Sequence, residues 1–140
     1  MISMGDLGVV IDFLRQSTNH KTYEEIADQL INAMTTWGLQ GIVQVRGRNG
    51  HLDRSSAGNL SPLQTSVLDT MRDMGRIFEF GSRAIVKYEH VSLLIQNLPT
   101  DAPDKVGRLR DHLAVLADGA DMRVAGLDAV NERNLHKIGI

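Results

Sequence analysis

A chain of 140 residues is long enough for one self-sufficient core and too short for two ordinary domains. The sequence has no cysteine, which excludes thiol nucleophiles, redox pairs, thiolate zinc sites and thioether-linked pigments, and its net charge of −2 with interspersed signs offers no electropositive footprint for nucleic acid. No apolar run approaches the roughly 18 to 20 residues of a membrane span, and the N-terminus lacks the features of a secretory signal, so we expect a cytoplasmic protein without membrane contact.

Two helices are predicted in the first part of the chain. A stripe at i, i+3, i+4 and i+7 predicts an amphipathic helix over residues 5–17; its members are Leu7, Val10, Ile11 and Leu14. Thr22 and Glu25 have the spacing of a capping box, which predicts the start of a second helix. This helix should end near Trp37, with Gly38 in the left-handed terminating conformation.

A β-hairpin should follow the second helix. The β-branched run at residues 42–46 leads into Asn49-Gly50, and this pair is a strong hairpin signal because both residue types tolerate positive φ. The returning strand at residues 51–56 is polar and charged, which favours a place at the edge of the sheet.

Ser61 and Pro62 predict the start of a third helix, with a capping residue and a proline in the first turn, and this helix should end at Gly75. Three strands are predicted after it, over residues 76–80, 83–88 and 90–97. The last two strands are joined either by a tight turn or as one long bulged strand, because the residues between them include neither glycine nor proline.

A long helix is predicted over residues 104–134. Its apolar residues follow heptad spacing, interrupted where Arg123 takes an apolar position: Val106, Leu109, Leu113, Leu116, Ala120, Leu127 and Val130. This stripe is either a seam between two molecules or the face that covers a sheet, and we expect the first half to serve the core and the second half a partner.

The element order predicts an α+β fold with a central antiparallel sheet of about five strands. The N- and C-terminal helices should lie on one face, the helix between the second and third strands should cover the other, and a small-molecule cavity can open beneath that cover. This order resembles the GAF/PAS superfamily, and GAF domains more closely because a helix separates the second and third strands.

Longer strings strengthen the resemblance: MGDLGVVIDFLRQS, WGLQGIVQVRG, LSPLQTSVLDTMRDMGRIFEFGSRAIVKYEHVSLLIQNLP and GRLRDHLAVLADGADMRVAGLD. They look like the region that follows the receiver domain in a family of bacterial response regulators. The resemblance implies a single GAF-like domain over residues 1–140 in two-component signalling, with a receiver domain upstream in the full-length protein, and it implies no cofactor and no known ligand. The chain is either excised from a longer response regulator or a free-standing version.

Candidate site residues fall into two groups. A ligand pocket for an anionic or aromatic metabolite would draw on aromatic, cationic and imidazole side chains: Phe78, Phe80, Arg83, Tyr88 and His90. In the alternative, the phenylalanines are core residues and the cations are solvated. The five histidines lack metal-ligand spacing and no Ser-His-Asp set is singled out, so we expect neither a metal site nor enzymatic activity.

The second group is a homodimer interface on the terminal helices, formed by their apolar stripes: Leu7, Val10, Leu14, Leu109, Leu113, Leu116 and Ala120. The leading hypothesis is therefore a non-enzymatic regulatory and dimerisation domain of a bacterial two-component response regulator. Its alternative is a GAF-like domain that senses a small molecule.

Overall fold

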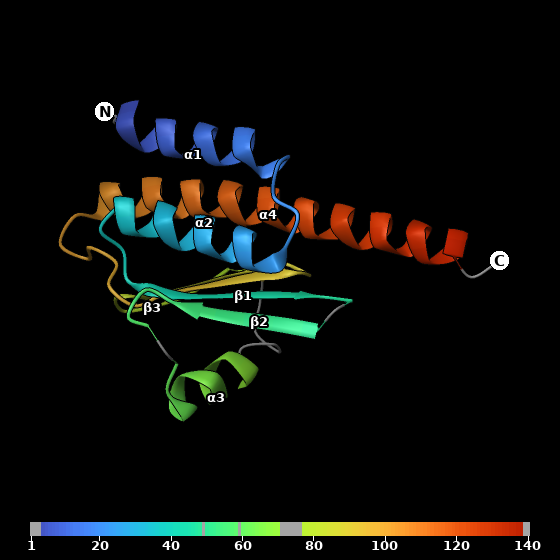
Figure 1. Cartoon of the computed structure of the whole chain (residues 1–140). Coiled ribbons are helices and arrows are strands. Elements are labelled where there is room, and N and C mark those ends of the chain that lie inside the picture. The colour runs from blue at the N-terminus through green and yellow to red at the C-terminus, as the bar shows by residue number, and fades with distance from the viewer. Residues whose placement is uncertain (1–3, 49, 59, 71–76, 139–140) are drawn as a thin grey trace.

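The computed structural model describes residues 4–48, 50–58, 60–70 and 77–138 (Figure 1). The elements in chain order are α1 Met4–Ser17, α2 Tyr23–Thr36, β1 Gly41–Gly47, β2 Gly50–Ser55, α3 Pro62–Thr70, β3 Ile77–Phe80, β4 Arg83–Lys87, β5 Val91–Ile95 and α4 Pro103–Ile138. The order of helices and strands agrees with the sequence prediction. The predicted end of the third helix, at Met71, Met74 and Gly75, lies outside the described residues.

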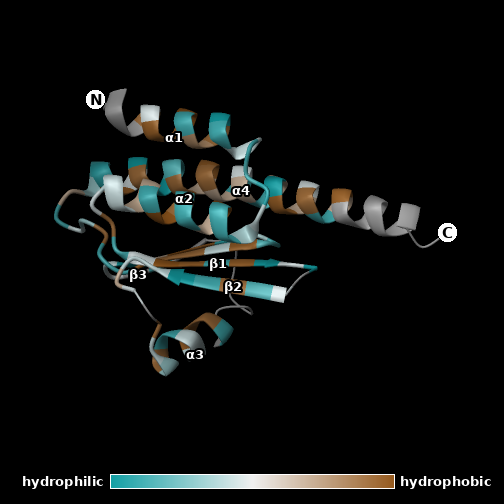
Figure 2. Ribbon diagram, viewed as in Figure 1, coloured by the Kyte–Doolittle hydropathy of each residue, from teal (hydrophilic) through white to brown (hydrophobic). Residues whose placement is uncertain are grey.

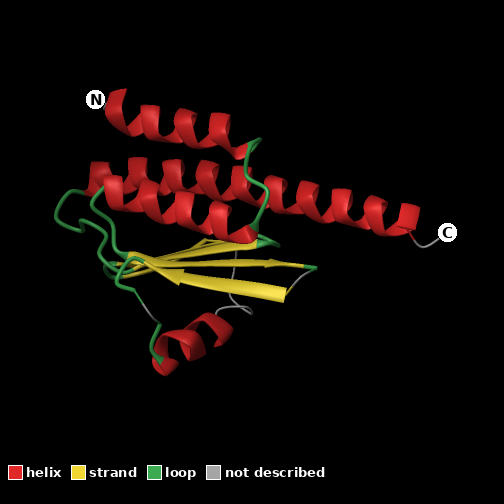
Figure 3. Ribbon diagram, in the orientation of Figure 1, coloured by secondary structure: helices red, strands yellow, loops and turns green. Residues whose placement is uncertain are grey.

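The strands, drawn in yellow in Figure 3, form one sheet. Its strand order is β2-β1-β5-β4-β3, and every neighbouring pair is antiparallel. The predicted α+β class and antiparallel sheet are therefore confirmed. β2 forms one edge, as its polar sequence predicted, and the connection through α3 carries the chain to the opposite edge at β3. A tight turn joins β4 to β5, with the Tyr88 amide donating to the Val91 carbonyl at 2.7 Å.

Helices lie on both sides of this sheet (Figure 1). α2 and α4 pack directly on one face, and α1 lies on the outer side of these two helices. α3 lies on the opposite face, alone among the described helices. The prediction placed both terminal helices on the sheet, whereas α1 packs on α2 and α4 and forms a further layer.

The main core lies between the sheet and the α2/α4 layer. Val43 and Val45 of β1 point into it, together with buried residues of α1, α2, β5 and α4. Among the described residues, a second cluster lies on the α3 side and includes Ile42, Leu68, Ile85 and Leu94, with Leu60 packed against it. Among the described residues of α3, Leu68 joins the helix to this cluster.

Local sequence signals account for the helix ends. The Thr22 hydroxyl accepts a hydrogen bond from the Glu25 amide at 3.1 Å, and Gly38 after α2 has φ of +75°. Ser61 and Gln64 form a reciprocal capping box at α3, with the Gln64 amide donating to the Ser61 hydroxyl at 3.2 Å and the Ser61 amide donating to the Gln64 side-chain oxygen at 2.9 Å. α4 runs unbroken through its three glycines.

The predicted dimer residues of α4 have a different environment from the one expected. Leu109, Leu113, Leu116 and Ala120 are all buried in the main core of the chain itself, as is Val10 of α1. Heptad spacing on α4 therefore serves the intramolecular contact with the sheet and α1 in this part of the helix. These five side chains leave no exposed surface for a second copy, which corrects the predicted interface at these positions.

Candidate functional site: a polar row beneath α3

The alternation of side chains along β1 places polar groups on the α3 face of the sheet. Val43 and Val45 point to the main core, so Ile42, Gln44 and Arg46 point to the α3 side. Ile42 belongs to the small apolar cluster there. The same face is thus apolar at one end of β1 and polar at the other.

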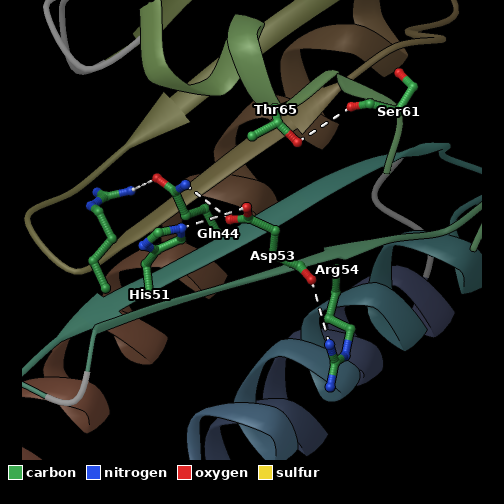
Figure 4. A network of polar contacts seen from close by, with 7 residues as sticks. Gln44, His51, Asp53, Arg54, Ser61 and Thr65 are labelled. Atoms are coloured by element: carbon green, nitrogen blue, oxygen red, sulfur yellow. Dashed lines mark hydrogen bonds and ion pairs between the residues drawn. The ribbon is translucent and has the colours of Figure 1, made fainter. Parts of the chain in front are cut away.

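A polar row crosses four strands at the level of Gln44. The strand register aligns Asp53 of β2 with Gln44, Gln44 with Ser92 of β5, and Ser92 with Lys87 of β4. Gln44 is 2% exposed and Ser92 is 6% exposed, so both residues are buried. The Gln44 amide donates to the Asp53 carboxylate at 2.9 Å, which satisfies its buried nitrogen (Figure 4).

Arg46 extends this row toward the β4–β5 turn. One guanidinium nitrogen donates to the Gln44 side-chain oxygen and to the Ser92 hydroxyl, both at 2.8 Å. The other nitrogen donates to the Tyr88 carbonyl at 2.6 Å and to the Glu89 carbonyl at 3.3 Å. Arg46 therefore ties the polar row of the sheet to the backbone of the turn.

A hollow of about 340 Å³ lies beside this row at the β2 edge. Its lining combines polar and apolar groups: Asp53, Arg54, Ser55, Gly58 and Leu60. Arg54 also reaches Asp28 of α2 at 3.4 Å. The α3 side of the sheet thus offers charged, amide, hydroxyl and apolar groups close together, which suits a ligand with both a polar and an apolar part.

The structure does not bring the five predicted pocket residues together. Phe78 and Phe80 pair with Ile85 and Arg83 through the backbone, and their side chains lie outside the described structure. Arg83 is exposed at the start of β4, on the α3 side by strand alternation. The remaining two predicted residues, Tyr88 and His90, lie in other parts of the structure.

Tyr88 points to the opposite face, where its hydroxyl donates to the Ala114 carbonyl of α4 at 3.3 Å. His90 lies in the β4–β5 turn, with its backbone amide donating to the Asp121 carboxylate of α4 and its Nδ1 atom 3.1 Å from the Arg46 carbonyl. Tyr88 and Arg83 therefore do not share a pocket beneath α3.

Sequence reasoning missed the polar row. Its signal was present in the string VQVRG, where Gln44 and Arg46 alternate with valines. Such alternation marks one polar face of an otherwise apolar strand. Identifying the partners Asp53 and Ser92 additionally requires the strand register, because they come from two other strands.

A second candidate surface is formed by exposed apolar residues of the two terminal helices. Of the predicted interface, Leu7 and Leu14 are exposed on α1, and Ile11 lies between them. Among the residues of α4 whose burial the structure describes, the exposed large apolar ones are Val115, Met122 and Val130. We call these six residues the α1/α4 stripe.

The two parts of the α1/α4 stripe meet at Gly119. A Cβ atom at Gly119 would lie 2.5 Å from Leu14 Cδ2, so the absence of a side chain there lets α1 approach α4 closely. Positions 115, 119, 122 and 126 recur at steps of four and three and share one side of α4. Figure 2 shows apolar residues along both helices, and α4 extends well beyond the end of α1.

The described part of the chain contains neither a group of metal-binding side chains nor a helix that could span a membrane. Its histidine and acidic side chains form no group of three that could hold a metal ion. None of its helices combines the length and the apolar character needed to cross a membrane.

Comparison with protein-family models and with curated protein sequences found no match. Among solved structures, the chain is similar to the native GAF domain of the potassium sensor histidine kinase KdpD from Escherichia coli, with a TM-score of 0.63. The alignment covers 87% of this chain and 96% of that one at 15% sequence identity. At this level of identity the likeness is one of fold, and the fold is that of a GAF domain.

Proposed function

We propose that the chain is a cytoplasmic, non-enzymatic regulatory domain of a bacterial two-component response regulator, and that it acts as a homodimer. The GAF-type fold supports a regulatory role, and the similar structure is a domain of a two-component sensor kinase. The strings quoted above favour placement after a receiver domain in a response regulator.

One observation carries the dimer part of this proposal: the α1/α4 stripe is apolar, exposed and continuous across two helices. Met122 is 67% exposed and lies one heptad after Val115. Heptad spacing on a projecting helix is typical of a seam with another helix. A second copy presents the same stripe, so a two-fold pairing covers both at once.

This arrangement gives a route for regulation. α1 is the first described helix, and a receiver domain joined to it on the N-terminal side would connect directly to the dimer surface. Because α1 packs on α4 through Leu14 and Gly119, a change in the pairing of α1 is passed to α4. The signal would leave the domain as a change in the distance or rotation of the paired α4 helices.

Light scattering and sedimentation at micromolar concentration test the dimer. Ile11→Glu and Met122→Glu should convert a dimer to a monomer, because each places a charge in the apolar seam. Leu63→Glu is the matched control, since Leu63 is 74% exposed on α3, on the other side of the sheet. A wild-type chain that is monomeric, or a dimer that both stripe variants leave intact, would remove this part of the proposal.

The alternative function is sensing of an anionic or aromatic metabolite beneath α3. It is favoured by the polar row, because Arg46, Gln44, Asp53 and Ser92 lie beside a small apolar cluster and a hollow. Native mass spectrometry of the purified protein tests it directly. A ligand retained by the wild type and lost in Arg46→Gln, but kept in Arg83→Gln, would support this function, whereas a ligand-free wild type purified without denaturation would count against it.

A further inference from the structure

The connection between α1 and α2 contains a buried histidine. His20 is 6% exposed, and its ring meets the Phe13 ring of α1 edge-on, with centroids 5.9 Å apart and planes at 60°. Its Nδ1 atom is buried without a hydrogen-bond partner among the described residues. An unpaired buried ring nitrogen is uncommon and costly, so the position of this ring calls for an explanation.

The backbone of the same residue is held by α4. The Arg123 guanidinium donates two hydrogen bonds to the His20 carbonyl oxygen, at 2.9 and 2.7 Å. Arg123 is the residue that interrupts the apolar pattern of α4. Its role is therefore to fasten the α1–α2 connection to α4, and with it the C-terminal end of α1.

Burial of the ring opposes its protonation, and the two charges near it act in opposite directions. Burial is the main cause that lowers the pKa of His20 below 6.5, Glu25 on α2 raises it, and Arg123 on α4 lowers it further. α1 presents the uncharged Phe13 ring. A proton on His20 would thus place a charge in a site with little access to water, where repulsion by Arg123 adds to the cost of burial and attraction by Glu25 offsets part of it.

We propose that protonation of His20 releases α1 from α4. A proton on its ring frees the α1–α2 connection from Arg123, and α1 then undocks. Undocking uncovers the apolar positions that Val10 and Phe13 occupy in the main core. It also separates the two halves of the α1/α4 stripe. The inference stands on the contacts within one chain and does not depend on the dimer or on a receiver domain.

The direction of the pH effect follows from the environment of the ring. The docked form binds the proton less readily than the opened form, so docking is fully favoured above about pH 6.5 and weakens as the pH falls below it. Because opening takes up one proton, each unit by which the pH falls raises the equilibrium constant for opening by up to about tenfold. The change stops once the docked form is itself protonated.

Hydrogen exchange followed by mass spectrometry tests this release. Peptides of α1 are compared between the wild type and His20→Gln at about pH 7.5 and about pH 5.5. Comparing the two proteins at the same pH cancels the intrinsic pH dependence of exchange. The expected result is that α1 of the wild type loses protection at the lower pH by up to about tenfold more than α1 of His20→Gln, while sheet peptides respond alike.

Two further variants make the outcome decisive. His51→Gln removes an exposed histidine on β2 and should behave as the wild type does. Arg123→Gln should leave α1 less protected at both pH values, because it removes the fastening itself. An α1 whose protection responds to pH identically in wild type and His20→Gln overturns the proposal, and so does acid-induced loss of protection that extends equally over the whole chain.

Discussion

The Tyr23 hydroxyl at the start of α2 donates a hydrogen bond to the Asp128 carboxylate on α4. The second oxygen of this carboxylate accepts from the Arg48 amide in the β1–β2 turn at 3.2 Å. Two helical turns earlier, Asp121 accepts from the His90 amide in the β4–β5 turn. Both turns lie at the same end of the sheet, because β1 and β5 are antiparallel neighbours. Two carboxylates of α4 therefore fix this helix to that end.

Tyr23→Phe should lower the free energy of unfolding by about 1–2 kcal/mol. The substitution keeps the ring in the core and removes the hydroxyl that bonds Asp128. Urea unfolding monitored by circular dichroism measures the change. Asp118→Asn is the control because Asp118 is exposed on α4. Equal stability of Tyr23→Phe and the wild type would show that the contact with Asp128 contributes nothing net.

Gly47→Ala should destabilise the fold by about 1–3 kcal/mol, whereas Gly107→Ala should leave it unchanged or stabilise it by up to about 1 kcal/mol. A Cβ atom at Gly47 would lie 2.0 Å from the Tyr23 hydroxyl oxygen and 2.7 Å from Asp128 Oδ2. At Gly107, within α4, a Cβ atom meets no atom within 4 Å. Thermal unfolding measures both effects. The melting temperatures of the two variants shift in opposite directions if the close approach at Gly47 is required, and in the same direction if it is not.

The sequence predicted those parts of the fold that local signals determine. Thr22 and Ser61 mark helix starts through short-range capping, and both caps form. Heptad spacing on α4 was ambiguous because a buried intramolecular face and an intermolecular seam require the same period. The polar row around Arg46 depends on strand register, which no single strand encodes. The burial of His20 arises from contacts with Phe13 and Arg123, distant in sequence from one another.

Arg46→Met should lower the free energy of unfolding by about 1–3 kcal/mol. It keeps much of the side-chain volume but removes the hydrogen bonds to the Tyr88 and Glu89 carbonyls and leaves the buried Ser92 with one bond fewer. Arg83→Met is the control, since this arginine is exposed, and it should stay within about 0.5 kcal/mol of the wild type. Similar effects of the two substitutions in chemical denaturation would contradict a structural role for Arg46.

Leu116→Arg and Val115→Arg compare the effect of a charge on the buried face of α4 with its effect on the exposed face. Leu116 is fully buried, so the charge should cost at least about 3 kcal/mol and unfold part of the population. Val115 is exposed, and its substitution should change stability by no more than about 0.5 kcal/mol while weakening self-association. Circular dichroism and light scattering on the same samples distinguish the two effects. A folded, monomeric Leu116→Arg would show that this residue faces a partner after all.

The pH dependence of stability provides an independent measure of the burial of His20. Since the pKa of its ring is lowered in the folded chain, the unfolded chain takes up the proton first, and stability falls as the pH drops below about 6.5. His20→Gln should lack this component, so the wild type loses more stability than the variant between about pH 7.5 and about pH 5.5. Burial is a larger cause than the charge of Arg123, and salt screens charges but does not rehydrate a buried ring. Most of the difference should therefore persist in about 0.5 M sodium chloride. A difference that salt abolishes would assign the effect to the charge of Arg123 instead of to burial.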